Sequence, residues 1–292
     1  MDNLTQMENR ELESLNCLLL RSICLFLILW LCVTTSALAE PLADRLAQFP
    51  RWESKPPVQV AKGDLVYPDW MVGTWQATST LVDMVAPLAP EMVTPGFEGN
   101  RRYLNQPLRF QVRFVKQRSP ISLRQKLLGP LLKAGEPSVV ADRAFNGLNI
   151  ALAYLGDSQK IFSDAPLKAT PPILSVKVDP NNPNRQITFL RGERQLVSVV
   201  TGRASEIPAA DRFIATEVSQ QVFQGRSQIY LNEVETTTAY QLLSTEAIAA
   251  DQVTAIYLSP QDPNYFAAIG RPVALYRYRL ELLPVDILTS DS

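Results

Sequence analysis

Hydrophobic and polar residues alternate along much of the chain with the two-residue period of a half-buried β-strand. The clearest case is the segment 108–115, where Leu108, Phe110, Val112 and Phe114 share one face and polar side chains occupy the other. Similar segments lie at 74–83, 173–178, 185–190, 195–200, 213–223, 227–235, 237–243, 253–258 and 274–283. Many short strands at close spacing predict an all-β fold with minor helices, as a sandwich or a barrel.

Two segments depart from this alternation. Residues 120–134 place leucines at helical spacing, interrupted by a Gly-Pro pair, and residues 139–155 are compatible with a short helix followed by a strand. A third short helix is possible at 42–49. In a barrel, we expect the first two segments to form a lid or a plug over one end.

The N-terminus carries the pattern of an export signal. An uncharged apolar run of 12 residues, 22–33, follows Arg21 and precedes the small-residue site Ala37-Leu38-Ala39. The alternative is an uncleaved membrane anchor, because residues 22–39 just reach the lower length limit for spanning a bilayer. We therefore predict a signal peptide (1–39), an extended N-terminal tail (40–68), a β-barrel domain (69–285) and a disordered C-terminal tail (286–292).

Composition excludes most catalytic chemistry. The chain has no histidine, and its only cysteines, Cys17, Cys24 and Cys32, lie in or beside the apolar leader. Nucleophile pairs that need histidine, thiolate chemistry and the usual zinc ligands are therefore absent. With 28 Lys+Arg against 29 Asp+Glu, the chain has no basic excess for nucleic acid. We predict a non-enzymatic protein with no catalytic residues, no metal and no cofactor.

The segment Asp69–Trp75 opens the first predicted strand with Gly73-Thr-Trp75. It resembles the Gly-x-Trp signature of lipocalins and related ligand-binding barrels, the calycins. This resemblance implies an antiparallel β-barrel in which Trp75 closes one end and a basic side chain of the last strand, Arg277 or Arg279, packs over it.

A wider set of motifs is more specific. The segments 70–75 (WMVGTW), 80–83 (TLVD), 86–90 (APLAP), 142–146 (DRAFN) and 262–266 (DPNYF) occur in this order. Together they resemble an uncharacterised family of cyanobacteria and plant chloroplasts, domain of unknown function 6816, over roughly residues 66–283. The resemblance implies a thylakoid-lumen or periplasmic setting and brings no known activity or site residues.

The candidate ligand-binding residues are those expected to face the barrel interior or its mouth. The aromatic candidates are Trp75, Phe110, Phe114 and Tyr276, and the last of these alternates inward together with Tyr278, Leu280 and Leu282. Arg143 is a candidate for binding a ligand carboxylate at the pocket mouth. The alternative is structural, with Asp142 capping a helix that begins at this point.

A long apolar, proline-rich loop follows the first strand and is expected to form an entrance lid. Its apolar candidates are Met84, Leu88, Met92 and Phe97, which could also form a surface for docking a partner, or simply cover the barrel end. Asp83, just before them, is either a buried carboxylate paired with Arg109 or Arg113, or an exposed strand-end residue at a bulge.

Two functions are favoured by the sequence, and an enzyme that uses carboxylate, lysine, tyrosine or oxygen-ligated metal chemistry is a third alternative. The first is an exported calycin-like protein that binds a small apolar or amphipathic ligand in a cavity of at least ~300 Å³. The alternative is a non-enzymatic accessory or assembly protein that docks on a photosynthetic thylakoid membrane complex. A closed, side-chain-filled interior would argue against the first function.

Overall fold

The computed structural model describes residues 41–118, 137–162, 173–225, 229–244, 246–268 and 270–285. The chain divides into two units, 1–39 and 40–292, and every described residue belongs to the second. The predicted signal peptide, the predicted helix at 120–134 and the C-terminal tail therefore lie outside the described residues, as do the side chains of residues 156–162.

The described part is built mainly of β-strands. They are β1 (Gln59–Val60), β2 (Gly73–Val85), β3 (Pro107–Gln117), β4 (Ser138–Ala141), β5 (Ile173–Asp179), β6 (Asn182–Leu190), β7 (Arg194–Ala209), β8 (Arg212–Gln224), β9 (Ile229–Ser244), β10 (Ala247–Leu258) and β11 (Ala274–Pro284). The helices are α2 (Leu42–Ala47), η1 (Asp69–Met71), η2 (Glu98–Tyr103), α4 (Arg143–Phe162) and α5 (Tyr265–Ala268).

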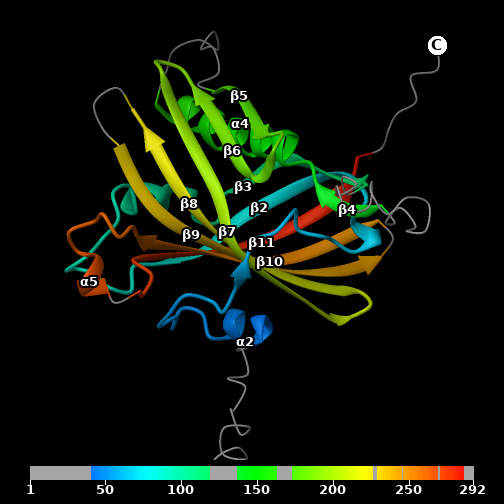
Figure 1. The fold of residues 1–292 in the computed structure, drawn as a ribbon, viewed down its shortest axis with the longest axis horizontal. Coiled ribbons are helices and arrows are strands. Elements are labelled where there is room, and N and C mark those ends of the chain that lie inside the picture. Colours follow the sequence, from blue (N-terminus) through cyan, green and yellow to red (C-terminus); the bar gives the residue numbers. More distant parts are fainter. Residues whose placement is uncertain are drawn as a thin grey trace, which may run out of the picture. The chain divides into compact units, whose positions relative to one another are not determined.

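The strands form one antiparallel sheet in the order β4-β3-β2-β11-β10-β9-β8-β7-β6-β5, and β1 pairs with β7. The sheet curls strongly, so that its two ends turn toward the same side (Figure 1). The prediction of an all-β antiparallel fold with minor helices is confirmed. The barrel takes the form of a curled half-barrel, in which the described edge strands β4 and β5 do not pair with each other.

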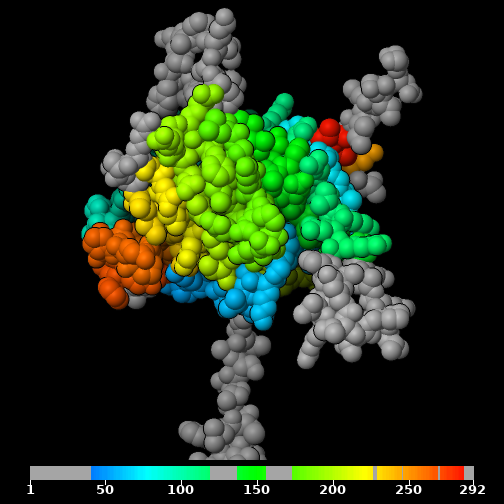
Figure 2. Space-filling model, turned by 45° about the horizontal axis from the view of Figure 1, so that its top comes forward, coloured from blue at the N-terminus to red at the C-terminus, as the bar shows by residue number. Residues whose placement is uncertain are grey.

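Helix α4 fills the space between the two ends of the sheet, where it packs against β3, β5 and β6. Its start is capped by Asp142, whose Oδ1 accepts the N–H of Phe145 at 3.1 Å. Asn146 then hydrogen-bonds both backbone groups of Arg113 at the free edge of β3, at 2.6 Å and 3.2 Å. In Figure 2 the darker-green helix region adjoins the light-green β5–β7 region. The helix thus protects an otherwise exposed strand edge.

This region corrects one prediction. We expected a short helix followed by a strand at 139–155, whereas the strand β4 comes first and α4 follows. The reason is local, because Val139 and Val140 favour a strand and Asp142 supplies the N-terminal cap of a helix. Gly147 permits close packing of this helix, since a Cβ there would lie 2.7 Å from the Nε2 atom of Gln186 in β6.

The N-terminal segment also bridges the edge strand β4 and the strand β7. Ala61 donates its N–H to the carbonyl of Thr201 in β7 at 3.0 Å, and Tyr67 donates to the carbonyl of Val139 in β4 at 2.9 Å. Within residues 40–68, which we predicted as an extended tail, the described residues 41–68 therefore contribute a helix, a strand and this bridge.

The two faces of the sheet carry separate cores. The inner face packs against Ile150 and Tyr154 of α4, and its core includes Trp75, Phe110 and Phe213. The outer face packs against α2 and the residues after it, and its core is formed by Leu42, Leu46, Trp52, Ile214, Val253, Ala255, Tyr257 and Leu275. Figure 1 shows α4 and α2 on opposite sides of the strands. "Inner" and "outer" refer to these two faces below.

This alternation overturns the expected contact over Trp75. The indole Nε1 of Trp75 donates to the carbonyl of Met71 at 2.8 Å on the inner side. Arg277 and Arg279 point to the outer face, where Arg277 pairs with Asp251 and its guanidinium lies 5.3 Å from the ring of Phe49. Strand residues one position apart face opposite sides, so an arginine that alternates with inward tyrosines cannot reach Trp75.

Of the two interpretations of Asp83, the structure shows the exposed strand-end residue at a bulge. The register between β2 and β11 shifts after Arg277, which leaves Val82 as the extra residue of a bulge. Asp83 is exposed opposite Arg277, whereas Arg113 pairs with Asp142 at 2.7 Å. The proposed buried pair between Asp83 and an arginine of β3 is therefore not formed with Arg113.

Candidate functional site

A cavity of about 470 Å³ opens where the inner face of the sheet meets α4 and η2. Its lining includes Ser79, Leu81, Leu108 and Tyr278 from the sheet, Tyr154 from α4, and Asn100, Arg102 and Tyr103 from η2. This volume exceeds the ~300 Å³ that a small-molecule site requires. The cavity is therefore the strongest candidate for a binding site on the inner side.

Three tyrosines form much of the cavity wall. The rings of Tyr103 and Tyr154 meet edge to face, with their centroids 6.4 Å apart. The Tyr154 hydroxyl is hydrogen-bonded to Ser79 and Tyr278. Burial raises the pKa of both Tyr154 and Tyr278, so these hydroxyls remain neutral hydrogen-bonding groups at physiological pH. The arrangement suits an aromatic or apolar ligand that carries a few neutral polar atoms.

The predicted aromatic residues are not among the residues that line this cavity. Trp75, Phe110 and Phe114 belong to the packed inner core, together with Leu65 and Met71. All three are buried.

Tyr276 comes closer to the cavity, because its hydroxyl accepts a hydrogen bond at 3.1 Å from Nδ2 of Asn100, a lining residue. Its ring contacts Phe97 at a centroid distance of 5.8 Å. A role in ligand binding remains a prediction for all four of these aromatic residues.

Arg143 lies in a cluster of charges on the inner face. Its Nη2 is 2.8 Å from Asp64 and 2.8 Å from Glu217, and Arg203 is 2.8 Å from the same Glu217 oxygen. Burial lowers the pKa of Arg143, but the two carboxylates outweigh this effect and leave the pKa raised. We call Asp64, Arg143, Arg203 and Glu217 the inner ion cluster. Arg143 thus pairs with two carboxylates of the protein itself. Asp142 caps the helix, as the structural alternative expected.

The lid residues fold back over the end of the sheet. Met84, Leu88 and Phe97 are buried, and Met92 is half-buried against Leu88 and its neighbours. Leu88 packs with Ala268 of α5. These four side chains therefore cover the barrel end and do not form an exposed apolar patch.

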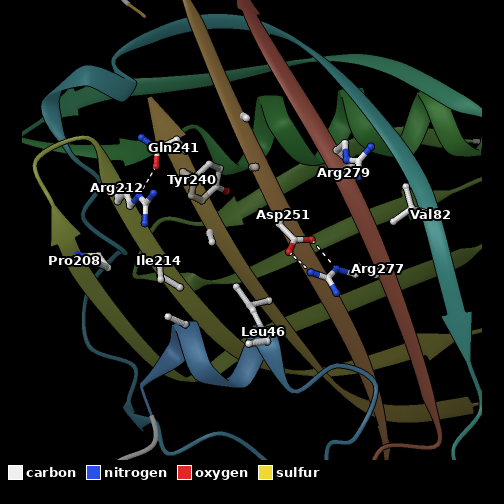
Figure 3. A pocket seen from close by; sticks show the side chains of 15 residues that line it. Leu46, Val82, Pro208, Arg212, Ile214, Tyr240, Gln241, Asp251, Arg277 and Arg279 are labelled. Carbon is white, nitrogen blue, oxygen red and sulfur yellow. Dashed lines mark hydrogen bonds and ion pairs between the residues drawn. The ribbon is translucent and has the colours of Figure 1, made fainter. Parts of the chain in front are cut away.

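A second groove, of about 680 Å³, lies on the outer face between α2 and strands β8–β11. Figure 3 shows Leu46 of α2 above the sheet, with Ile214 nearby and the Arg277–Asp251 pair crossing between β11 and β10. Arg279 also lines this groove. Its floor is apolar and its rim carries arginines, in contrast to the tyrosine-lined inner cavity.

The sequence contained part of the signal for the inner cavity. Leu108 and Tyr278 fall on faces that the alternation had already marked as inward, although neither was selected as a site residue. Tyr103, Asn100 and Tyr154 come from η2 and α4, which tertiary packing brings to the sheet. No local pattern in the sequence indicates that these segments meet.

Among the residues with described structure, no three His, Cys, Asp or Glu side chains gather in a way that could hold a metal ion. The helices of the same residues include none with the length and apolar character of a membrane span.

No curated protein and no solved structure was found to match this chain. Residues 59–286 match the model of a family described as Domain of unknown function (DUF6816). The match begins at β1 and ends just past β11, so it takes in the curled sheet, helix α4, the segment that bridges β7 and β4, and the inner cavity. The chain therefore belongs to the DUF6816 family.

Proposed function

We propose that this protein is an exported, calycin-like carrier or sensor that binds a small apolar or amphipathic ligand on the inner side of its curled sheet. The observation that carries the proposal is the 470 Å³ cavity between β2, β11, α4 and η2. Its apolar and aromatic wall, with a few neutral polar groups, is the usual composition of a ligand pocket.

Export is supported by the leader alone. The apolar run and the small-residue site at 37–39 favour processing after Ala39. The location that we propose, the thylakoid lumen or the periplasm, is what the resemblance to a family of cyanobacteria and chloroplasts implies. Mass spectrometry of the protein isolated from its native host tests both parts together. A mature chain that begins at Glu40 and a copurifying small molecule are the expected results, and an intact leader would instead favour the anchored form.

A probe of binding follows from the cavity. The fluorescence of the neutral apolar dye N-phenyl-1-naphthylamine should rise when it binds to the full chain. Replacing Leu81, which lines the cavity, by Trp fills that space and should weaken binding about tenfold or more. The matched control is Thr80→Trp, whose side chain points away from the cavity, and it should leave binding unchanged.

Thermal unfolding of both variants separates loss of the cavity from loss of the fold. Overpacking at Leu81 should cost about 1–3 kcal/mol, which leaves a folded domain. Equal dye binding by the wild type and Leu81→Trp would reject this cavity as the binding site.

A second candidate function is an accessory role on a photosynthetic membrane complex, favoured by one observation. Phe266, in α5, is 84% exposed, although it is the largest apolar side chain of its segment. Exposed aromatic side chains serve as anchors in protein interfaces. If α5 docks on a partner, Phe266→Ser should abolish crosslinking to that complex, whereas Leu283→Ser, which also changes an exposed apolar residue, should not.

A further inference from the structure

The inner face of the sheet changes character from one side to the other. On β2, β3 and β11 it is apolar and aromatic, as the core there shows. On β6 to β9 the strand pairing places Gln186 opposite Ser198, Ser198 opposite Gln221, and Gln221 opposite Asn232. Directly paired residues share a face, so these four form one row across four strands. We call them the polar row.

The polar row lies on the inner face. Asn232 lies eight positions before Tyr240 of the inner core along β9, an even offset without a register shift, so both side chains share one face. Gln186 points to α4, since its amide Nε2 would lie only 2.7 Å from a Cβ built on Gly147. All four side chains of the row are only half-buried, although the curl of the sheet turns this face inward. A row of inward side chains that is uncharged, polar and accessible is unlike a packed core.

Two buried polar atoms on this face have no hydrogen-bond partner among the described residues: Oδ1 of Asn232 and Nε of Arg203. One is an acceptor and the other is a donor. Buried polar groups are rarely left unpaired, and such exceptions point to a water or a ligand group. Arg203 is otherwise neutralised by Glu217, so the charges nearby are already paired within the protein.

These observations define the chemistry of the missing partner. It offers both donors and acceptors to amide and hydroxyl side chains, and it needs no net charge, which is the property of hydroxyl groups. We propose that the polar row binds an uncharged, hydroxyl-rich head group, such as a sugar, of an amphiphile whose apolar part occupies the tyrosine-lined cavity. This inference rests on the proposed ligand-binding function and names its ligand class.

Three amphiphiles with the same alkyl chain test the head group: octyl β-glucoside, octyl sulfate and 1-octanol, each below its critical micelle concentration. Calorimetric titration of the full chain should give the tightest binding for the glucoside, by about tenfold over the other two, the effect of one or two net hydrogen bonds. Methyl β-glucoside, which has the sugar without the chain, should bind far more weakly. Equal affinity for methyl and octyl glucoside would overturn the proposal that the ligand is an amphiphile with its apolar part in the cavity.

The variant pair Gln221→Leu and Gln220→Leu provides a matched control, because neighbouring glutamines of β8 face opposite sides. Gln221→Leu should weaken octyl glucoside binding about five- to tenfold and leave the naphthylamine dye and octanol unaffected. Gln220→Leu, which changes an exposed outer residue, should leave all three unaffected.

The outcomes separate this inference from the function on which it rests. If the dye binds but the three octyl amphiphiles bind equally, or if the two glutamine variants behave alike, the sugar-binding row is rejected and the cavity stands. If neither the dye nor any amphiphile binds to a protein with a cooperative thermal transition, both proposals fail. Asn232→Leu offers a second test in the same row, with the same expected loss for the glucoside alone.

Discussion

Two arginine clusters lie on opposite faces of the same sheet, and they differ in how completely their hydrogen-bonding groups are paired. On the outer face, Arg45 of α2 makes two 2.7 Å hydrogen bonds to Glu235 of β9. Tyr257 and Thr237 add hydrogen bonds of 2.7 Å and 2.8 Å to the same carboxylate. The side chains of Arg45 and Glu235 are 4% and 0% exposed. We call this group the outer ion cluster.

The inner ion cluster is more open. The side chains of Arg143 and Glu217 are 16% and 20% exposed, and Nε of Arg203 lacks a partner among the described residues. A cluster that is sealed and fully paired can only hold parts of the fold together. A cluster that borders an accessible polar face, with a donor left over, is placed to meet a ligand or water. The comparison therefore assigns a structural role to the outer cluster and supports the binding site that we propose on the inner side.

The outer cluster attaches the N-terminal segment to the sheet. The guanidinium of Arg45 lies 3.9 Å from the ring of Trp52, whose indole donates to the Arg45 carbonyl at 2.8 Å. Both residues come from the segment that precedes β1. The segment that bridges β7 and β4 is therefore held at its start by a buried ion pair.

The largest effect is expected from breaking the outer pair. Glu235→Leu leaves the Arg45 guanidinium buried without its carboxylate, and should lower the free energy of unfolding by about 3–5 kcal/mol. Urea denaturation of the full chain measures this loss. The double variant Arg45→Met/Glu235→Leu removes both charges and should recover most of the stability. A double variant as unstable as the single one would show that the pair contributes more than mutual neutralisation.

Breaking the inner pair should cost less. Glu217→Leu leaves Arg143 with Asp64 as a partner and leaves Arg203 partly in contact with solvent, so we expect a loss of about 1–2 kcal/mol. The same denaturation assay compares the two leucine variants directly. A larger loss for Glu217→Leu than for Glu235→Leu would reverse the assignment of structural and functional roles.

The sequence predicts which face is buried for some strands but not for others. In β3 and β11, apolar and charged residues alternate strictly, and the inward assignment of Phe110, Tyr276 and Tyr278 follows directly. In β8 and β9, polar residues occur on both faces, so the pattern does not distinguish the buried Glu235 from the accessible Gln221. That distinction depends on which face receives α2, which is a tertiary contact.

The bridge between β7 and β4 could not be predicted from local sequence patterns either. Nothing in the residues 59–67 indicates that they join β7 to β4, because this bridge depends on segments far apart in the chain. The lid shows the same limit. Its apolar residues suited an exposed docking surface and a cover equally well, and only the contact of Leu88 with α5 distinguishes the two.

Alkaline pH should loosen both clusters, because a buried tyrosine belongs to the outer cluster and another lies beside the inner one. Burial raises the pKa of Tyr257 beside Glu235 and of Tyr67 beside the inner cluster, and burial likewise raises the pKa of Tyr240 to about 12. The folded state therefore holds protons that the unfolded state releases near pH 10. The stabilisation is complete below about pH 10 and is lost as the pH rises toward the folded pKa values.

Absorbance of the phenolate ion measures this effect. We expect some tyrosines of the folded protein to titrate near pH 10 and the buried ones only at higher pH, together with a fall in the urea midpoint above pH 10. Tyr257→Phe should remove part of this alkaline destabilisation. Titration of every tyrosine near pH 10 in the folded protein would contradict the burial of these hydroxyls.

The smallest effect is expected at Gly147, where α4 approaches β6 and the polar row. In a helix interior, alanine is favoured over glycine by about 1 kcal/mol. Against this gain, a Cβ would lie 2.7 Å from the flexible amide of Gln186 and 3.2 Å from Cγ1 of Val176, so Gln186 must move. The two effects nearly cancel, and Gly147→Ala should change stability by less than about 1 kcal/mol while weakening octyl glucoside binding. Unchanged glucoside affinity with a shifted stability would mean that Gln186 packs against the helix and takes no part in the polar row's function.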